Sequence, residues 1–150
     1  MKGHPTEGFT TMPTIYSIDA LSTGAGRDGH VTTSDGMVDL EMRAPKELGG
    51  SGEGFNPEQL FAAGYAACFH SALNSVARGR KIQLTDATVG ARVELVSVDD
   101  GLQLAVHLEV VIPSEPHDVA QELADAAHKL CPYSNATRGN IEVTITVTDD

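Results

Sequence analysis

The chain of 150 residues lacks tryptophan, is poor in aromatic and basic residues, and contains only two cysteines. Lysine and arginine number 10 against 21 aspartates and glutamates, which gives a formal net charge of -11. An acidic surface of this kind repels phosphate groups, which argues against nucleic acids and anionic membranes as partners. We expect the charge mainly to keep the protein soluble.

Long apolar segments are also missing. The longest apolar run, residues 60–69, is far shorter than the roughly 20 residues that a membrane-spanning helix needs. Residues 1–13 contain no apolar core of a secretory signal. We therefore expect a cytoplasmic protein, in which Cys68 and Cys131 are free thiols, a redox pair or metal ligands.

The first third of the chain predicts short strands and turns behind a tail. Residues 1–13 are polar and without period, so we predict a flexible N-terminal tail there and one domain over residues 14–150. Strands are expected over 14–22, 30–34 and 37–43. A glycine-rich turn at 24–29 and a hairpin turn at Asp35-Gly36 separate them, and a glycine-rich loop covers 45–55.

The rest of the chain predicts two helices and three strands. Asn56 is a helix N-cap, Pro57 fits the first helical position, and Gly79 is a natural stop. This helix is apolar nearly all round from residue 60 to 73, so we expect protein on every side of it. Further predictions are alternating strands over 87–98 and 102–112, an amphipathic helix over 117–130 ended by Cys131-Pro132, and a strand over 141–148. Without a regular βαβ repeat, the fold class is α+β.

The two cysteines are the first candidates for chemistry. Cys68 lies in the middle of the apolar helix and Cys131 at the end of the later helix, and either could be a passive core residue. Arg27 suggests more, because a guanidinium near a thiol stabilises the thiolate, which is the nucleophilic form. Glu58 could hold that arginine in place, although a turn cation and a helix-start anion are the simpler interpretation of Arg27 and Glu58.

The spacing between Glu58 and Cys68 carries a geometric prediction. Ten residues correspond to about 15 Å along one helix axis, so the two side chains cannot meet on the same helix. Two copies of the helix crossing antiparallel near residue 63, within Ala62-Ala63-Gly64, would bring Glu58 of one chain close to Cys68 of the other. Our hypothesis is therefore a homodimer with composite sites.

Other site types receive little support from the sequence. His128 and Cys131 form an HxxC pair, but no third clustered ligand accompanies them. The glycines of residues 49–52 lack the lysine of a phosphate-binding loop. His70 lies two residues from Cys68 and should point away from it on a helix. We expect neither a metal nor a tightly bound cofactor.

Four segments carry a resemblance to a known family: GRDG at 26–29, PKELGG at 45–50, NPEQLFAAGYAACF at 56–69, and CPYSNATRGN at 131–140. Over about residues 15–147 the chain resembles the organic hydroperoxide resistance proteins of the OsmC-like superfamily. The PKELGG segment favours that branch over the broader OsmC branch. The resemblance implies an OsmC-like α+β fold, an intertwined homodimer in which antiparallel sheets wrap central helices, and a bacterial cytoplasmic protein.

The resemblance also assigns roles at the site. It implies that Cys68 is the peroxidatic cysteine, Cys131 the resolving cysteine, and Arg27 and Glu58 their supporting pair. It implies organic substrates, especially fatty-acid hydroperoxides, rather than inorganic peroxide. It further implies an external dihydrolipoyl dithiol, carried by a lipoylated protein, as the reductant in place of thioredoxin.

The sequence thus predicts a thiol peroxidase. The Cys68 thiolate would attack the peroxide to give a sulfenic acid, and Cys131 would convert this to a disulfide. Leu60, Phe61 and Phe69 are candidate walls of an apolar substrate pocket, although core packing is the simpler interpretation for most of them. Three alternatives stay open: a module that binds a hydrophobic ligand with passive cysteines, a redox sensor that signals through a partner, and a thiol hydrolase with a Cys–His pair.

Overall fold

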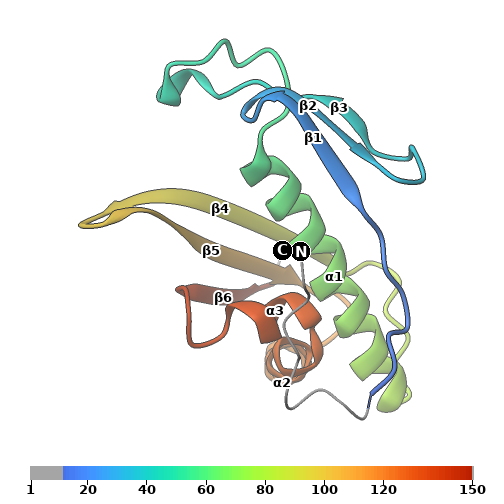
Figure 1. The fold of residues 1–150 in the computed structure, drawn as a ribbon. Helices are drawn as coiled ribbons and strands as arrows, with labels where there is room; N and C mark the ends of the chain where they lie inside the picture. The colour runs from blue at the N-terminus through green and yellow to red at the C-terminus, as the bar shows by residue number, and fades with distance from the viewer. Residues whose placement is uncertain (1–11, 150) are drawn as a thin grey trace. The chain divides into compact units, whose positions relative to one another are not determined.

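The computed structural model describes residues 12–149, which divide into two units, one ending at Phe55 and the other beginning at Asn56 (Figure 1). The tail predicted over residues 1–13 lies almost entirely outside the described residues. The single domain over 14–150 stays a prediction. Within residues 12–149, no helix has both the length and the apolar character needed to cross a membrane.

The first unit contains a three-stranded antiparallel sheet in the order β1-β2-β3, with β1 at Ala20–Ala25, β2 at Asp28–Thr33 and β3 at Asp39–Glu41. The turn between β1 and β2 is tighter than predicted, because Ala25 already pairs with Asp28 and only Gly26 and Arg27 remain unpaired. Gly26 has a φ of 70°, as the first central residue of a two-residue hairpin turn of type II′ requires. The predicted turn at Asp35-Gly36 is confirmed between β2 and β3.

This first unit buries almost none of its own apolar side chains. Its buried residues include Met42 and Ala44, whereas Ile15 is 97% exposed, Met37 83% and Leu21 67%. A small sheet is stable only when one face packs against something. The apolar residues of this unit therefore form a surface suited to being covered.

The second unit begins with helix α1 (Pro57–Gly79), as predicted. Asn56 and Gln59 form a reciprocal capping box, in which each side chain accepts a hydrogen bond from the other residue's backbone N–H at 2.9 Å. The helix ends at Gly79, the predicted stop, but Gly79 is still helical and the left-handed residue after the helix is Lys81, with a φ of 61°.

The sheet of the second unit has the order β4-β5-β6, with β4 at Thr88–Val98, β5 at Gly101–Val111 and β6 at Val143–Thr148. The antiparallel hairpin of β4 and β5 confirms the alternating patterns. Strand β6 pairs with β5 in parallel, which corrects the expectation of purely antiparallel sheets. A parallel neighbour needs a crossover, and helices α2 (His117–Leu130) and α3 (Pro132–Thr137) supply it.

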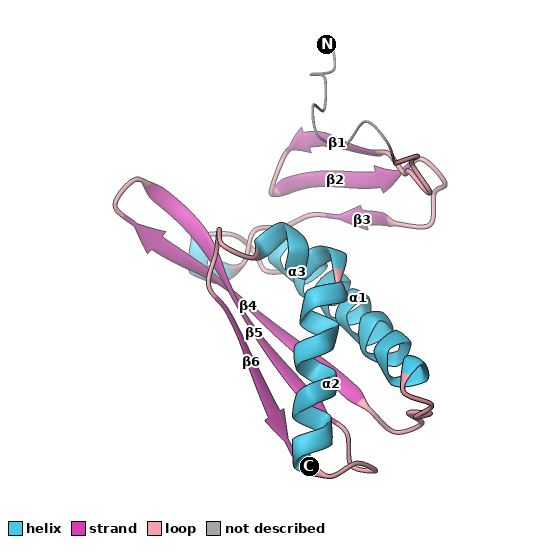
Figure 2. Ribbon diagram, turned by 90° about the horizontal axis from the view of Figure 1, so that it is seen from below, coloured by secondary structure: helices cyan, strands magenta, loops and turns pink. Residues whose placement is uncertain are grey.

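Helices α1 and α2 lie on one face of this sheet (Figure 2). The core between them contains Phe69 and Leu73 of α1, Leu108 of β5, and Leu123 of α2, all fully buried. Helix α3 was not predicted. Pro132 was interpreted only as the residue that ends α2, but it also occupies the first position of a new helix, where its missing N–H costs nothing.

One face of α1 is not covered within the chain, contrary to the expectation of protein on every side. Ala63, Ala67, Ser71 and Ser75 recur every four residues and are all exposed. Residues four apart lie on the same side of a helix. The apolar pattern therefore predicted more burial than one chain provides.

Candidate functional site

The two cysteines, 63 residues apart in the chain, meet in space. The sulfur atoms of Cys68 and Cys131 are 3.6 Å apart, and both thiols are free. A disulfide needs a separation of about 2.05 Å, so the pair is reduced but close enough to bond after a small side-chain movement. Cys131 is completely buried, whereas Cys68 is only partly so. The arrangement therefore places a partly exposed thiol, Cys68, next to a fully buried thiol, Cys131.

The break between α2 and α3 positions Cys131. Its backbone is extended (φ -63°, ψ 123°), and its N–H donates to Ala127 O at 2.8 Å to close α2. Its carbonyl oxygen then accepts from the N–H of Asn135 at 2.9 Å to open α3. The short connection between two helices therefore fixes the direction in which the buried sulfur points.

The surroundings of Cys68 within this unit favour its neutral form. Burial raises the pKa of the Cys68 thiol, and the neighbouring Cys131 raises it further. A hydrogen bond from the backbone N–H of Tyr133 acts in the opposite direction and lowers that pKa, but the net shift is upward. A nucleophilic role for Cys68 therefore requires an additional positive charge.

A buried hydrogen-bond network fastens α3 to α1 beside the thiols. The Tyr65 hydroxyl is 2.8 Å from Ser134 Oγ and 3.1 Å from Thr137 Oγ1, and all three side chains are buried. Ser134 Oγ also lies 2.8 Å from His128 Nδ1. Burial lowers the pKa of His128, and the charge of Arg138 lowers it further, so the neutral imidazole is favoured.

The sequence interpretation missed this network. Its only signal was the position of Tyr65 three residues before Cys68 and of Ser134 three residues after Cys131. His128, considered above as half of an HxxC pair, belongs to the network through Ser134. Among residues 12–149, no group of three or more His, Cys, Asp or Glu side chains could hold a metal ion.

An aromatic cluster closes the N-terminal side of Cys68. The ring centroid of Tyr133 lies 6.0 Å from that of Phe61 and 5.6 Å from that of Tyr65. The Tyr133 hydroxyl rests against Gly64, where an added Cβ would lie only 2.7 Å from the hydroxyl oxygen. Gly64 therefore permits the tyrosine to lie directly on α1, one helical turn before the thiol.

A hollow of about 330 Å³ opens on the C-terminal side of Cys68. Its lining is formed by Cys68, Ser71, Ala72, Ser75, Leu130 and Pro132. The pocket walls expected from the sequence were different. Phe69 is fully buried in the core, and neither Leu60 nor Phe61 lines this hollow. One wall is polar and the other apolar.

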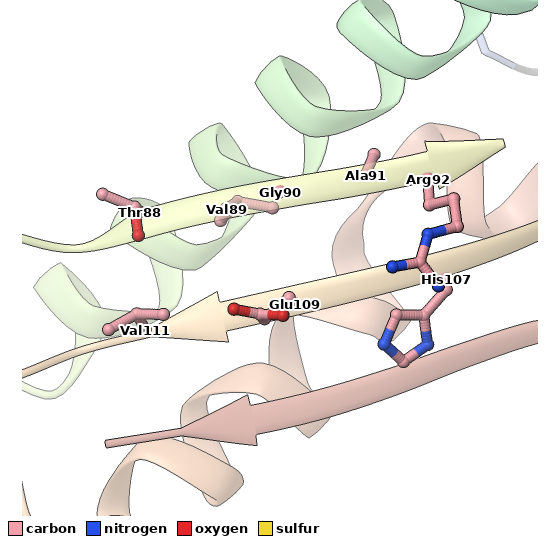
Figure 3. Close-up of a pocket in the computed structure, with 8 residues that line it drawn as sticks. All are labelled: Thr88, Val89, Gly90, Ala91, Arg92, His107, Glu109 and Val111. Carbon is pink, nitrogen blue, oxygen red and sulfur yellow. The ribbon is translucent and has the colours of Figure 1, made fainter. Parts of the chain in front are cut away.

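A second hollow lies over strands β4 and β5 and contains neither thiol. Figure 3 shows Arg92 and His107 side by side on this sheet face, with Glu109 farther along β5. His107 Nδ1 lies 2.5 Å from Thr144 Oγ1, which is within hydrogen-bond distance. Because this open surface carries both the Arg92 cation and the Glu109 carboxylate and neither thiol, we do not take it as the candidate site.

The two remaining predicted site residues lie apart from the thiols in sequence. Arg27 occupies the second position of the β1–β2 turn, in the first unit. A hydrogen bond holds that turn in place: Asp28 Oδ1 accepts from the N–H of Ala44 at 3.1 Å. Glu58 is the second residue of α1, and α1 runs unbroken to Cys68, so the separation of about 15 Å holds along one helix.

Comparisons with known proteins point in one direction. The family model described as OsmC-like protein matches residues 50–146. An organic hydroperoxide resistance protein of Xanthomonas axonopodis pv. citri is 44% identical over 135 residues, covering 89% of this chain and 94% of the relative.

Two solved structures are similar over nearly their whole length. An organic hydroperoxide resistance protein from Elizabethkingia anophelis has a TM-score of 0.87 and 49% identity, covering 93% of this chain and all of that one. The organic hydroperoxide resistance protein OhrB of Bacillus subtilis has a TM-score of 0.82 and 39% identity, covering 90% and 100%.

The packing of Tyr133 on Gly64 predicts an unusual glycine substitution. Replacing a helix-interior glycine by alanine ordinarily stabilises a protein by about 0.5–1 kcal/mol. Gly64→Ala should instead lower the free energy of unfolding by about 1–3 kcal/mol, because the new methyl overlaps the Tyr133 ring. Urea unfolding of the reduced protein measures this difference.

Two variants isolate the cause. Gly79→Ala adds a methyl with no atom within 4 Å, so it should be neutral or stabilising. In a Tyr133→Ala background the cost of Gly64→Ala should disappear. A Gly64→Ala protein that is as stable as Gly79→Ala would show that the tyrosine does not occupy this position.

Proposed function

The chain belongs to the OsmC-like family, within its organic hydroperoxide resistance proteins, and on that premise we propose that it is a thiol peroxidase that reduces organic hydroperoxides to alcohols. The observation that carries the proposal is the contact of 3.6 Å between an accessible Cys68 sulfur and a buried Cys131 sulfur. The names of the relatives supply the class of substrate.

The proposed reaction has two chemical steps in this protein. The Cys68 thiolate attacks the distal oxygen of the hydroperoxide. A sulfur–oxygen bond forms, the oxygen–oxygen bond breaks, and the alkoxide leaves and takes a proton to become an alcohol. The Cys131 thiol then attacks the sulfenic acid and displaces water, which leaves a Cys68–Cys131 disulfide.

Accessibility supports this order of roles. Cys68 borders the hollow in which a substrate could lie, so it is the thiol that meets the peroxide. Cys131 is completely buried and its sulfur lies 3.6 Å from that of Cys68, which suits a resolving thiol. A thiol that solvent and substrate do not reach would make a poor first nucleophile.

Arg27 is the proposed source of the positive charge that Cys68 needs. Because the upward pKa shift leaves little thiolate at neutral pH, a permanent cation beside the sulfur would restore reactivity. Glu58 would orient the arginine, as the resemblance implies for the family. Both assignments are proposals that rest on the matched motif residues.

We propose a homodimer with composite sites. Three features support it: the exposed apolar residues of the first unit, the exposed small residues along α1, and the length of helix between Glu58 and Cys68. Crossing two α1 helices antiparallel near Ala63 would cover the open face and bring Glu58 of each chain toward Cys68 of the other. A second copy would serve both stability and catalysis.

The electron donor is proposed from the resemblance alone. A dihydrolipoyl dithiol on a lipoylated protein would reduce the disulfide by thiol–disulfide exchange, in the cytoplasm, without a cofactor bound tightly to this chain. Attack on the partly exposed Cys68 sulfur is the accessible route. The net reaction consumes one hydroperoxide and one dithiol, and yields an alcohol, water and an oxidised lipoyl group.

Thiol titration tests the roles of the cysteines. After one equivalent of an alkyl hydroperoxide, the reduced protein should lose two thiols, because both sulfurs enter the disulfide. Cys131→Ser should stop at a sulfenic acid, and Cys68→Ser should not react. A native protein that keeps both thiols would favour a passive binding module, and a disulfide without turnover by any dithiol would favour a redox sensor.

Hybrid dimers test the composite site. A dimer of one Cys68→Ser chain and one Glu58→Gln chain keeps one intact site only if each site takes its cysteine and glutamate from different chains. We therefore expect the hybrid to recover about half of the native peroxidase activity, although each parent homodimer is strongly impaired. A hybrid no more active than its parents would place both residues of a site on the same chain.

A further inference from the structure

Two side-chain contacts of different kinds join α1 to the short segment over residues 131–137. One is the sulfur–sulfur contact of 3.6 Å between Cys68 and Cys131. The other is the hydrogen bond of 2.8 Å between the Tyr65 hydroxyl and Ser134 Oγ. Tyr65 precedes Cys68 by three residues, or about 4.5 Å along the helix axis, and Ser134 follows Cys131 by three. The hydroxyl pair therefore lies about one helical turn from the thiol pair and joins the same two parts of the chain.

The backbone of the segment connects the position of Ser134 to that of Cys131. The carbonyl oxygen of Cys131 accepts from the N–H of Asn135 at 2.9 Å, and the ring of Pro132 restricts the backbone directly after Cys131. Tyr65 and Ser134 are both 0% exposed, so water does not reach the pair to replace a lost hydrogen bond. An anchor at Ser134 therefore restrains Cys131 relative to α1.

The second step of the proposed reaction depends most strongly on this position. In the first step the hydroperoxide is a free molecule that can adjust to Cys68, whereas in the second step both reacting sulfurs belong to the protein. Their separation must shorten from 3.6 Å to about 2.05 Å. A misplacement of about 1 Å can slow a reaction about a hundredfold. A slow second step also leaves the sulfenic acid open to a second hydroperoxide, which oxidises it to a sulfinic acid.

We propose that Tyr65 is a positioning residue for the second step, because its hydroxyl holds Ser134 and thereby keeps Cys131 in place to form the disulfide. This inference rests on the proposed peroxidase function and adds to it a residue that acts through Ser134. In that step the Cys131 sulfur gives an electron pair to the Cys68 sulfur. A sulfur–sulfur bond forms, the sulfur–oxygen bond of the sulfenic acid breaks, and the hydroxyl leaves as water with the thiol proton. The hydrogen bond is buried inside the second unit, so this role does not depend on what covers the exposed face of α1.

The competition between disulfide and sulfinic acid provides the test. Tyr65→Phe removes only the hydroxyl and keeps the ring that packs against Tyr133. Disulfide formation should slow by about tenfold, in line with the loss of one buried hydrogen bond, whereas oxidation of Cys68 to the sulfenic acid should change by less than about twofold. Without a reductant, the concentration of tert-butyl hydroperoxide that converts half of Cys68 to sulfinic acid should therefore fall about tenfold. Mass spectrometry after rapid acid quenching measures both products and both rates.

Three further variants separate positioning from a general loss of stability. Tyr16→Phe makes the same change at a side chain that is 73% exposed, and it should match the native protein in both steps. Val110→Ala leaves a cavity in the core at β5 and lowers stability, but it should not change the ratio of disulfide to sulfinic acid. Ser134→Ala removes the other half of the bond, so the double variant with Tyr65→Phe should be no slower than the slower single variant.

Several outcomes would overturn the inference. A native ratio of products in Tyr65→Phe would mean that the hydroxyl does not position Cys131. An equal slowing of both steps, or the same change of ratio in Val110→Ala, would mean that the bond only stabilises the fold. Losses that multiply in the double variant would mean that the two hydroxyls act separately. Failure of the proposed function is a separate result, because the native protein would then form neither a sulfenic acid nor a disulfide.

Discussion

The contact between the Cys68 and Cys131 sulfur atoms is the interaction on which the account depends. One sulfur comes from the middle of α1, the other from the single residue between α2 and α3. The pair is held by the packing of α2 on α1 and by the buried hydroxyls of Tyr65 and Ser134. Because no covalent bond joins the thiols, this packing must keep them close in the reduced protein.

Burial gives this pair its geometry but also limits its reactivity. The same surroundings that hide Cys131 raise the pKa of the Cys68 thiol, so the helix core alone produces a poor nucleophile. A cation therefore has to come from elsewhere. Glu58 lies about 15 Å from Cys68 along the axis of the same helix, which is too far to hold that cation beside the thiol. Under the proposed homodimer, this constraint would connect the chemistry of one thiol to the assembly of two chains.

Local signals in the sequence predicted the elements that bear the site, but not their contacts. The N-cap Asn56, with Pro57 at the first helical position, located the start of α1, and period-two alternation located β4 and β5. The parallel pairing of β6 and the second role of Pro132 as the start of α3 were missed, because both depend on what the chain packs against. The sequence itself made both thiols candidates and the resemblance implied their roles, whereas the hollow lined by Ser71 follows only from the three-dimensional structure.

The most direct test of the central claim is a measurement of the pKa of the Cys68 thiol in the Cys131→Ser protein. The titration is monitored by the ultraviolet absorbance of the thiolate. It is carried out once with Arg27 present and once with the Arg27→Gln substitution added. The account predicts a pKa below the value of about 8.5 for a free cysteine when Arg27 is present, and a clear rise when the guanidinium is removed. A pKa above that value, unchanged by the substitution, would mean that Cys68 is never activated and would contradict the proposed peroxidase.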